Sequence, residues 1–92
     1  MTQAISRKFI DNDRTRVTEW RFAPGAETGQ HRHEYDYVVV PMLTGQLRIV
    51  SSDGEVLSDL TVGSPYFRPA GVEHNVFSAN DFEFVFVEIE FK

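Results

Sequence analysis

The chain has 92 residues, of which 14 are acidic and nine basic, for a formal net charge of −5, and it contains no cysteine. A chain of this length has a small core, so we expect residues 1–92 to be a single domain supplemented by a metal or a dimer partner. The lack of cysteine excludes disulfides and thiol chemistry and agrees with a reducing compartment. The negative charge and the scattered arginines argue against nucleic-acid binding.

No segment is apolar enough to cross a membrane. The longest uninterrupted apolar run, residues 38–43, is far shorter than the roughly 20 residues that a membrane-spanning helix needs. The N-terminus also lacks the apolar region of a signal peptide. We therefore expect a soluble, cytoplasmic protein that does not act at membranes.

The hydrophobic pattern predicts strands and no helix of more than one turn. Alternation is clearest at residues 14–23, where Thr18, Trp20 and Phe22 share one face. Turn residues such as Asp53-Gly54 separate these segments. The other predicted strands are residues 4–10, 37–43, 46–50, 55–60, 66–68, 73–79 and 82–91. About eight short strands predict an all-β sandwich or barrel, of which a jelly roll best encloses a small ligand.

The last predicted strand, residues 82–91, is apolar on both faces near its start. We expect it to lie in the centre of a sheet, or to be covered by a second sheet or subunit. This strand and the short chain also lead us to expect a homodimer. The aromatic side chains expected in the core, some of them lining a cavity, are Trp20, Phe67, Phe77, Phe84 and Phe86.

The three histidines fall in two short segments. His31 and His33 are two positions apart, so on an extended strand both rings leave the same face. His74 follows a turn at Pro69-Ala70-Gly71. A single histidine is more often structural than a ligand, but three in this arrangement indicate a metal site if the fold joins the two segments.

These two segments resemble the signature motifs of the cupins. The matching patterns are Gly25-x5-His31-x-His33 with Gly45, and Gly63-x5-Pro69-x-Gly71-x2-His74. The resemblance implies a cupin-type double-stranded β-helix, a small jelly-roll barrel, in which His31, His33 and His74 bind a divalent metal. Residues 31–41 are also similar to small single-domain cupins associated with β-alanine degradation.

The resemblance fails at the glutamate that usually completes the first motif. Tyr37 and Val38 stand at the corresponding positions. The chain therefore resembles the three-histidine subgroup, which includes dioxygenases of diketones and thiols. Two questions stay open at this point: whether Asp36 is a fourth ligand, an acceptor for an imidazole N–H or an exposed carboxylate, and whether Tyr37 offers its hydroxyl to a substrate or only packs.

Three neutral imidazoles suit iron, which we favour, as well as Ni, Zn, Mn or Cu, and they leave coordination positions open. We expect a dioxygenase-like enzyme, or a Lewis-acid isomerase or lyase, acting on a small carbonyl, carboxylate or thiol compound. Tyr37 and Arg68 are the expected catalytic residues. Arg68, like Arg48, lies in an otherwise apolar strand and would clamp an anion or face outward. The alternatives are a non-catalytic module that binds a small ligand or metal, and a cupin with an empty site.

Overall fold

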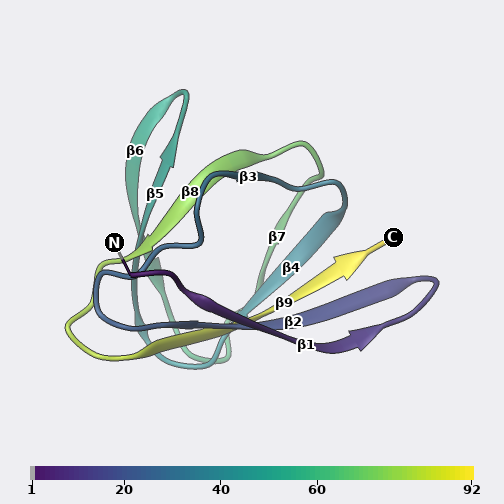
Figure 1. Ribbon diagram of the computed structural model, residues 1–92, viewed down its shortest axis with the longest axis horizontal. Coiled ribbons are helices and arrows are strands. Elements are labelled where there is room, and N and C mark those ends of the chain that lie inside the picture. Colours follow the sequence, from purple (N-terminus) through teal and green to yellow (C-terminus); the bar gives the residue numbers. More distant parts are fainter. Residues whose placement is uncertain (1) are drawn as a thin grey trace.

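The computed structural model describes residues 2–92, which form strands joined by turns (Figure 1). The strands are β1 (Ile5–Asp11), β2 (Thr15–Phe22), β3 (His31–Arg32), β4 (Asp36–Pro41), β5 (Gly45–Ser51), β6 (Gly54–Leu60), β7 (Tyr66–Arg68), β8 (Glu73–Ser78) and β9 (Phe84–Phe91). The prediction of an all-β fold is confirmed. Residues 2–92 contain no helix that is long and apolar enough to span a membrane.

The strands form two antiparallel sheets that enclose the interior. The larger sheet has the order β1-β2-β9-β4-β7 and the smaller β3-β8-β5-β6. Neighbours in a sheet are often distant in sequence, as where β4 pairs with β9 and β5 with β8. Figure 1 shows the two sheets as opposite walls. The tips of the β1–β2 and β5–β6 hairpins, which belong to these sheets, extend outward from the barrel. This is the jelly-roll arrangement expected from the sequence.

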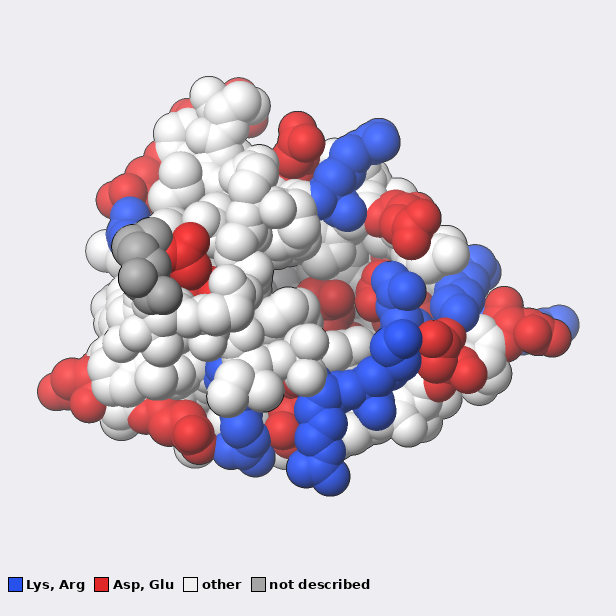
Figure 2. All heavy atoms as spheres, viewed as in Figure 1, with Lys and Arg blue, Asp and Glu red and all other residues white. Residues whose placement is uncertain are grey.

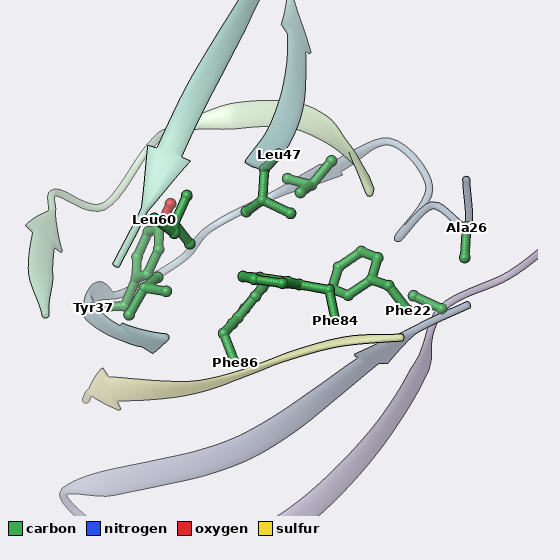
Figure 3. Close-up of a cluster of buried hydrophobic side chains, with 10 residues drawn as sticks. Phe22, Ala26, Tyr37, Leu47, Leu60, Phe84 and Phe86 are labelled. Carbon is green, nitrogen blue, oxygen red and sulfur yellow. The ribbon is translucent and has the colours of Figure 1, made fainter. Parts of the chain in front are cut away.

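The core lies between the two sheets. Figure 3 shows Phe22, Phe84 and Phe86 pointing from the larger sheet toward Leu47 of β5. Phe22 and Phe84 are completely buried, and the ring centroids of Phe22 and Phe86 are 5.5 Å apart. The strand that carries two of these rings, β9, lies in the middle of its sheet, as predicted from its two apolar faces.

The inner face of the larger sheet changes from apolar to polar along its strands. Successive inward pairs of β2 and β9 are Phe22–Phe84, Trp20–Phe86, Thr18–Glu88 and Arg16–Glu90. The hydrophobic core fills the apolar end. The polar end is left to the cavities described below.

Two aromatic residues expected in the core lie outside it. Phe67 is 54% exposed, and Phe77 lies under the guanidinium of Arg48, 4.1 Å from its ring centroid. Tyr66 and Val76 take the inward positions beside them. Because successive side chains of a strand point to opposite faces, Phe67 and Phe77 are directed outward.

Gly45, the first residue of β5, packs closely against Phe84 and Asn80. A Cβ at this position would be 2.8 Å from a ring carbon of Phe84 and 2.7 Å from Oδ1 of Asn80. We expect Gly45→Ala to lower the free energy of unfolding by about 1–3 kcal/mol, because buried Phe84 cannot move aside freely. Urea unfolding measures the change. In a Phe84→Leu background the same substitution should cost less, and an equal cost in both backgrounds would contradict this explanation.

Candidate metal centre

Pairing between β3 and β8 brings the histidines together. His31 lies directly opposite His74 in this antiparallel pair. His33 follows β3 and stays in the ladder, since its N–H donates to the Val72 carbonyl at 2.9 Å and its carbonyl accepts from the Gly71 N–H at 2.8 Å. His31 and His33 therefore point to the same side as His74. The three histidines of the two sequence segments therefore come together, as expected.

The Nε2 atoms of the three rings meet at short distances. They are 3.0 Å apart for His31 and His33, and 3.2 Å for His33 and His74. Metal–imidazole bonds are about 2.1 Å long, so two ligands at right angles around one ion would place their nitrogens about 3.0 Å apart. The observed separations match a set of three ligands on one face of a metal ion.

Hydrogen bonds alone do not explain this cluster. A neutral imidazole has one N–H and one lone pair, on different nitrogens. Nε2 of His33 has two nitrogen neighbours at hydrogen-bond distance, and it can bond to only one of them at a time. A cation among the rings would accept all three lone pairs. The donor set therefore fits a divalent transition metal.

The backbone orients the ring of His31. Its Nδ1–H donates to the Gly29 carbonyl at 2.8 Å, and Oγ1 of Thr28 lies 3.3 Å from the same nitrogen. Gly29 has a φ of 87°, in the left-handed region that glycine adopts without strain. Because Nδ1 carries the proton, Nε2 of His31 presents a lone pair to the other two rings.

Burial keeps two of the rings uncharged. His33 and His74 are only 6% and 8% exposed. Burial, and secondly the charge of His31, lowers the pKa of each ring to about 4. Both rings are therefore neutral near pH 7, which is the state that binds a metal.

Two cavities adjoin the histidine rings, the first lined by all three and the second by His31 and His33. The first, of about 250 Å³, has mainly apolar walls contributed by both sheets. The second, of about 320 Å³, is lined largely by polar and charged residues of β1, β2 and β9. The residues that line both are Trp20, Thr28, His31, His33 and Glu88. Figure 2 shows the surface hollowed near its centre, with acidic atoms visible inside.

Tyr37 and Arg68 both line the first cavity. Tyr37 is buried, and its ring stacks on His33 with centroids 3.9 Å apart. Burial raises the pKa of its hydroxyl well above the usual value. Arg68 lies opposite Tyr37 in the β4–β7 pair, and its guanidinium lies 4.5 Å from the ring centroid of Tyr66. The catalytic roles of Tyr37 and Arg68 stay predictions.

Asp36 and Arg48 do not line either cavity. Oδ1 of Asp36 accepts from the Ala70 N–H at 2.8 Å, so this carboxylate fixes the turn before β8. Arg48 donates from Nη1 to Glu55 at 2.8 Å. Asp36 therefore has a structural contact outside the histidine cluster.

Sequence reasoning missed Glu88. This residue is 9% exposed and points inward from β9. One carboxylate oxygen of Glu88, one of Glu90 and a ring nitrogen of His33 lie within 4.8 Å of one another. Burial, and secondly the charge of Glu90, raises the pKa of Glu88 to about 7. A signal was available in the alternation of β9, which puts Glu88 and Glu90 on the same face as Phe84 and Phe86.

Comparisons with known proteins agree with the fold and the motifs. The family model described as Cupin domain matches residues 18–90. The chain is 54% identical over 90 residues to the beta-alanine degradation protein BauB of Pseudomonas aeruginosa, covering 98% of this chain and 95% of BauB. It is also similar to a crystal structure of a cupin domain from Bordetella pertussis Tohama I, with 60% identity, a TM-score of 0.97, and coverage of 99% of this chain and 95% of that one.

A more distant likeness extends to the polyketide cyclase RemF of Streptomyces resistomycificus. The TM-score is 0.76 at 22% identity, over 97% of this chain and 65% of RemF. At that identity the likeness shows a shared fold only.

The metal-free protein is expected to lose stability as the pH falls below the ordinary histidine value. His33 and His74 titrate near 6.5 when unfolded and about 4 when folded, so their contribution is complete above about pH 6.5 and is lost toward pH 4. The expected loss between about pH 7 and pH 5 is about 2 kcal/mol for each ring. Urea unfolding of chelator-treated protein measures it. His74→Gln should make the dependence shallower, and an unchanged dependence in this variant would contradict the assignment.

Proposed function

The chain belongs to the cupin family, and we propose that it is an enzyme that depends on a divalent transition metal bound by His31, His33 and His74. The observation that carries the proposal is the approach of three Nε2 atoms, at 3.0 and 3.2 Å, in the wall of a cavity. When bound, the metal supplies Lewis acidity and, if it is iron, redox chemistry with O2.

The residues around the site favour a small anionic substrate. The first cavity, of about 250 Å³, is small for a ligand pocket. Three neutral imidazoles leave the double positive charge of a metal uncompensated, and Arg68 adds a further positive charge at the cavity wall. A small carbonyl compound with a carboxylate or enolate group would fit this small cavity and its excess positive charge. The name of BauB supports this class, since β-alanine is itself a small carboxylate.

Arg68 and Tyr37 are positioned to orient such a substrate. Nη1 of Arg68 donates to the Phe67 carbonyl, and within residues 2–92 this guanidinium forms no ion pair with a carboxylate. Its other N–H groups can bind a substrate carboxylate. Tyr37 stays protonated because burial raises its pKa, so its hydroxyl would donate a hydrogen bond rather than accept a proton.

Among metal-dependent reactions we favour an oxygenase, because three imidazoles on one face leave open positions for both a substrate and O2. A non-redox isomerase or lyase would use the same open positions. A module that binds a ligand without turnover is the alternative of another class.

Protein purified without a histidine tag or chelators is expected to contain about one equivalent of a transition metal. Elemental analysis measures it. His31→Gln and His74→Gln should each reduce the content severalfold, whereas Asp53→Asn in the exposed β5–β6 turn serves as a control and should not. Less than about a tenth of an equivalent in the unsubstituted protein, even after anaerobic reconstitution with Fe(II), would contradict the proposal.

Turnover is tested separately from metal binding. Iron-loaded protein should consume O2 in the presence of a 1,3-dicarbonyl, 3-oxo acid or thiol, followed with an oxygen electrode and product analysis. Arg68→Ala should raise KM for an anionic substrate at least about tenfold with a smaller effect on kcat. Tight ligand binding without any product across such a panel would contradict an enzyme and favour the binding module.

We also propose that two copies of the chain pair through the outer face of the larger sheet. One apolar row crosses all five strands of this sheet, and its members are Ile10, Val17, Ile89, Val38 and Phe67. The two end residues, Ile10 and Phe67, are 48% and 54% exposed. A continuous apolar surface of this kind is typical of an interface.

Light scattering on a sizing column tests this pairing, and the unsubstituted protein should have the mass of a dimer. Ile10→Lys combined with Phe67→Lys should shift it toward the monomer, since both side chains are largely exposed and the fold does not need them. Val56→Lys, at a 61% exposed position on β6, is the control. A monomeric unsubstituted protein would contradict the pairing.

A further inference from the structure

We propose that Glu88 is a fourth, carboxylate ligand of this metal centre, supplied by β9 in place of the glutamate that the first motif lacks. The inference rests on the proposed metal site. It extends that proposal by assigning a ligand on a strand that carries neither histidine segment.

The register of the larger sheet places Glu88 beside the position of the missing glutamate. Of the two residues at the corresponding positions, Tyr37 and Val38, Tyr37 is the one that lines the cavity, and β9 is the neighbour of β4. Tyr37 lies opposite Glu90, and Val39 lies opposite Glu88. Glu88 and Tyr37 are therefore diagonal neighbours on the inner face, and β9 brings a carboxylate to the wall from which a glutamate at position 37 would reach.

Glu88 is largely buried, and its carboxylate faces the cavities without a bonding partner. It is 9% exposed, and within residues 2–92 its carboxylate has neither an ion pair nor a hydrogen bond. Its neighbour Glu90, 5% exposed, accepts two hydrogen bonds from Arg16, at 2.8 and 2.7 Å. Because Arg16 is already bonded to Glu90, it does not neutralise Glu88. Within residues 2–92 the only fully buried side-chain oxygen without a partner belongs to Glu27, so the Glu88 carboxylate faces the open space of the cavities. A cation there would neutralise it.

Glu88 is also close to one ring of the histidine cluster, that of His33. One of its carboxylate oxygens lies within 4.8 Å of a ring nitrogen of His33, and its side chain lines both cavities. His31 and His74 are not within that distance of the same carboxylate, so the Glu88 side chain would have to turn toward them to share their metal. Glu90 shares this proximity but is held by Arg16. Glu73, which lines the first cavity, is exposed to solvent. Among the acidic residues that line the cavities, Glu88 thus combines a largely buried side chain, proximity to His33 and the lack of a partner.

A carboxylate ligand would change the electrostatics of the centre. Three imidazoles and one carboxylate leave a single net positive charge on a divalent ion instead of two. That charge, together with Arg68, still attracts a substrate carboxylate. A mixed set of nitrogen and oxygen ligands also suits iron, zinc and manganese.

The probe for the test is Co(II), added to the metal-free protein and followed by its visible absorption spectrum. Glu88→Gln keeps the shape of the side chain and removes its charge. It should weaken Co(II) binding at least about tenfold and change the spectrum, because one oxygen ligand is lost. Glu83→Gln is the matched control, since it removes the same charge from an exposed residue that pairs with Arg21, and it should change neither.

Glu88→Asp keeps a carboxylate and should restore much of the affinity that Glu88→Gln loses, provided that thermal unfolding shows both variants to be folded. Unchanged affinity and spectrum in Glu88→Gln would overturn the inference and leave the three-histidine site standing. Failure of the unsubstituted protein to bind Co(II) would overturn the proposed metal site together with this inference.

Discussion

The antiparallel pairing of β3 with β8 is the constraint on which the site depends. It sets His31 opposite His74, and the backbone bonds of His33 to Val72 and Gly71 extend the same ladder. A shift of one residue in this register would turn the ring of His31 to the other face and separate it from His74. Because β3 is only two residues long, the flanking Thr28 N–H, which donates to the Val76 carbonyl at 2.9 Å, also helps to hold the register.

One end of the barrel interior is a hydrophobic core, and the other end holds the polar residues of the candidate site. Phe22 and Phe84 fill the apolar end, whereas Glu88 and the three histidines occupy the polar end. A chain of 92 residues has little apolar surface to bury, so a cavity in its interior takes up space that would otherwise be core. A metal that joins imidazoles from two distant segments would offset this loss, since binding to the folded state adds to stability.

Local signals were enough to predict eight of the nine strands in residues 2–92, all except the two-residue β3, and the histidine cluster. The inward face of each strand was harder to assign. Alternation predicted that Thr18 and Phe22 share a face, and the motif spacing predicted the histidine set. Phe67 and Phe77 were wrongly expected in the core, because hydrophobicity does not reveal which side of a strand faces the interior. Glu88 was missed because its inward position depends on the pairing of β9 with β2 and β4, which are distant in sequence.

Anomalous diffraction from crystals grown with Fe(II) or Co(II) tests the central claim most directly, because it locates a metal independently of activity. The account predicts one strong peak about 2.1 Å from Nε2 of each of His31, His33 and His74. A peak bound to fewer than two of these rings, or no peak in crystals that contain the metal in solution, would contradict it.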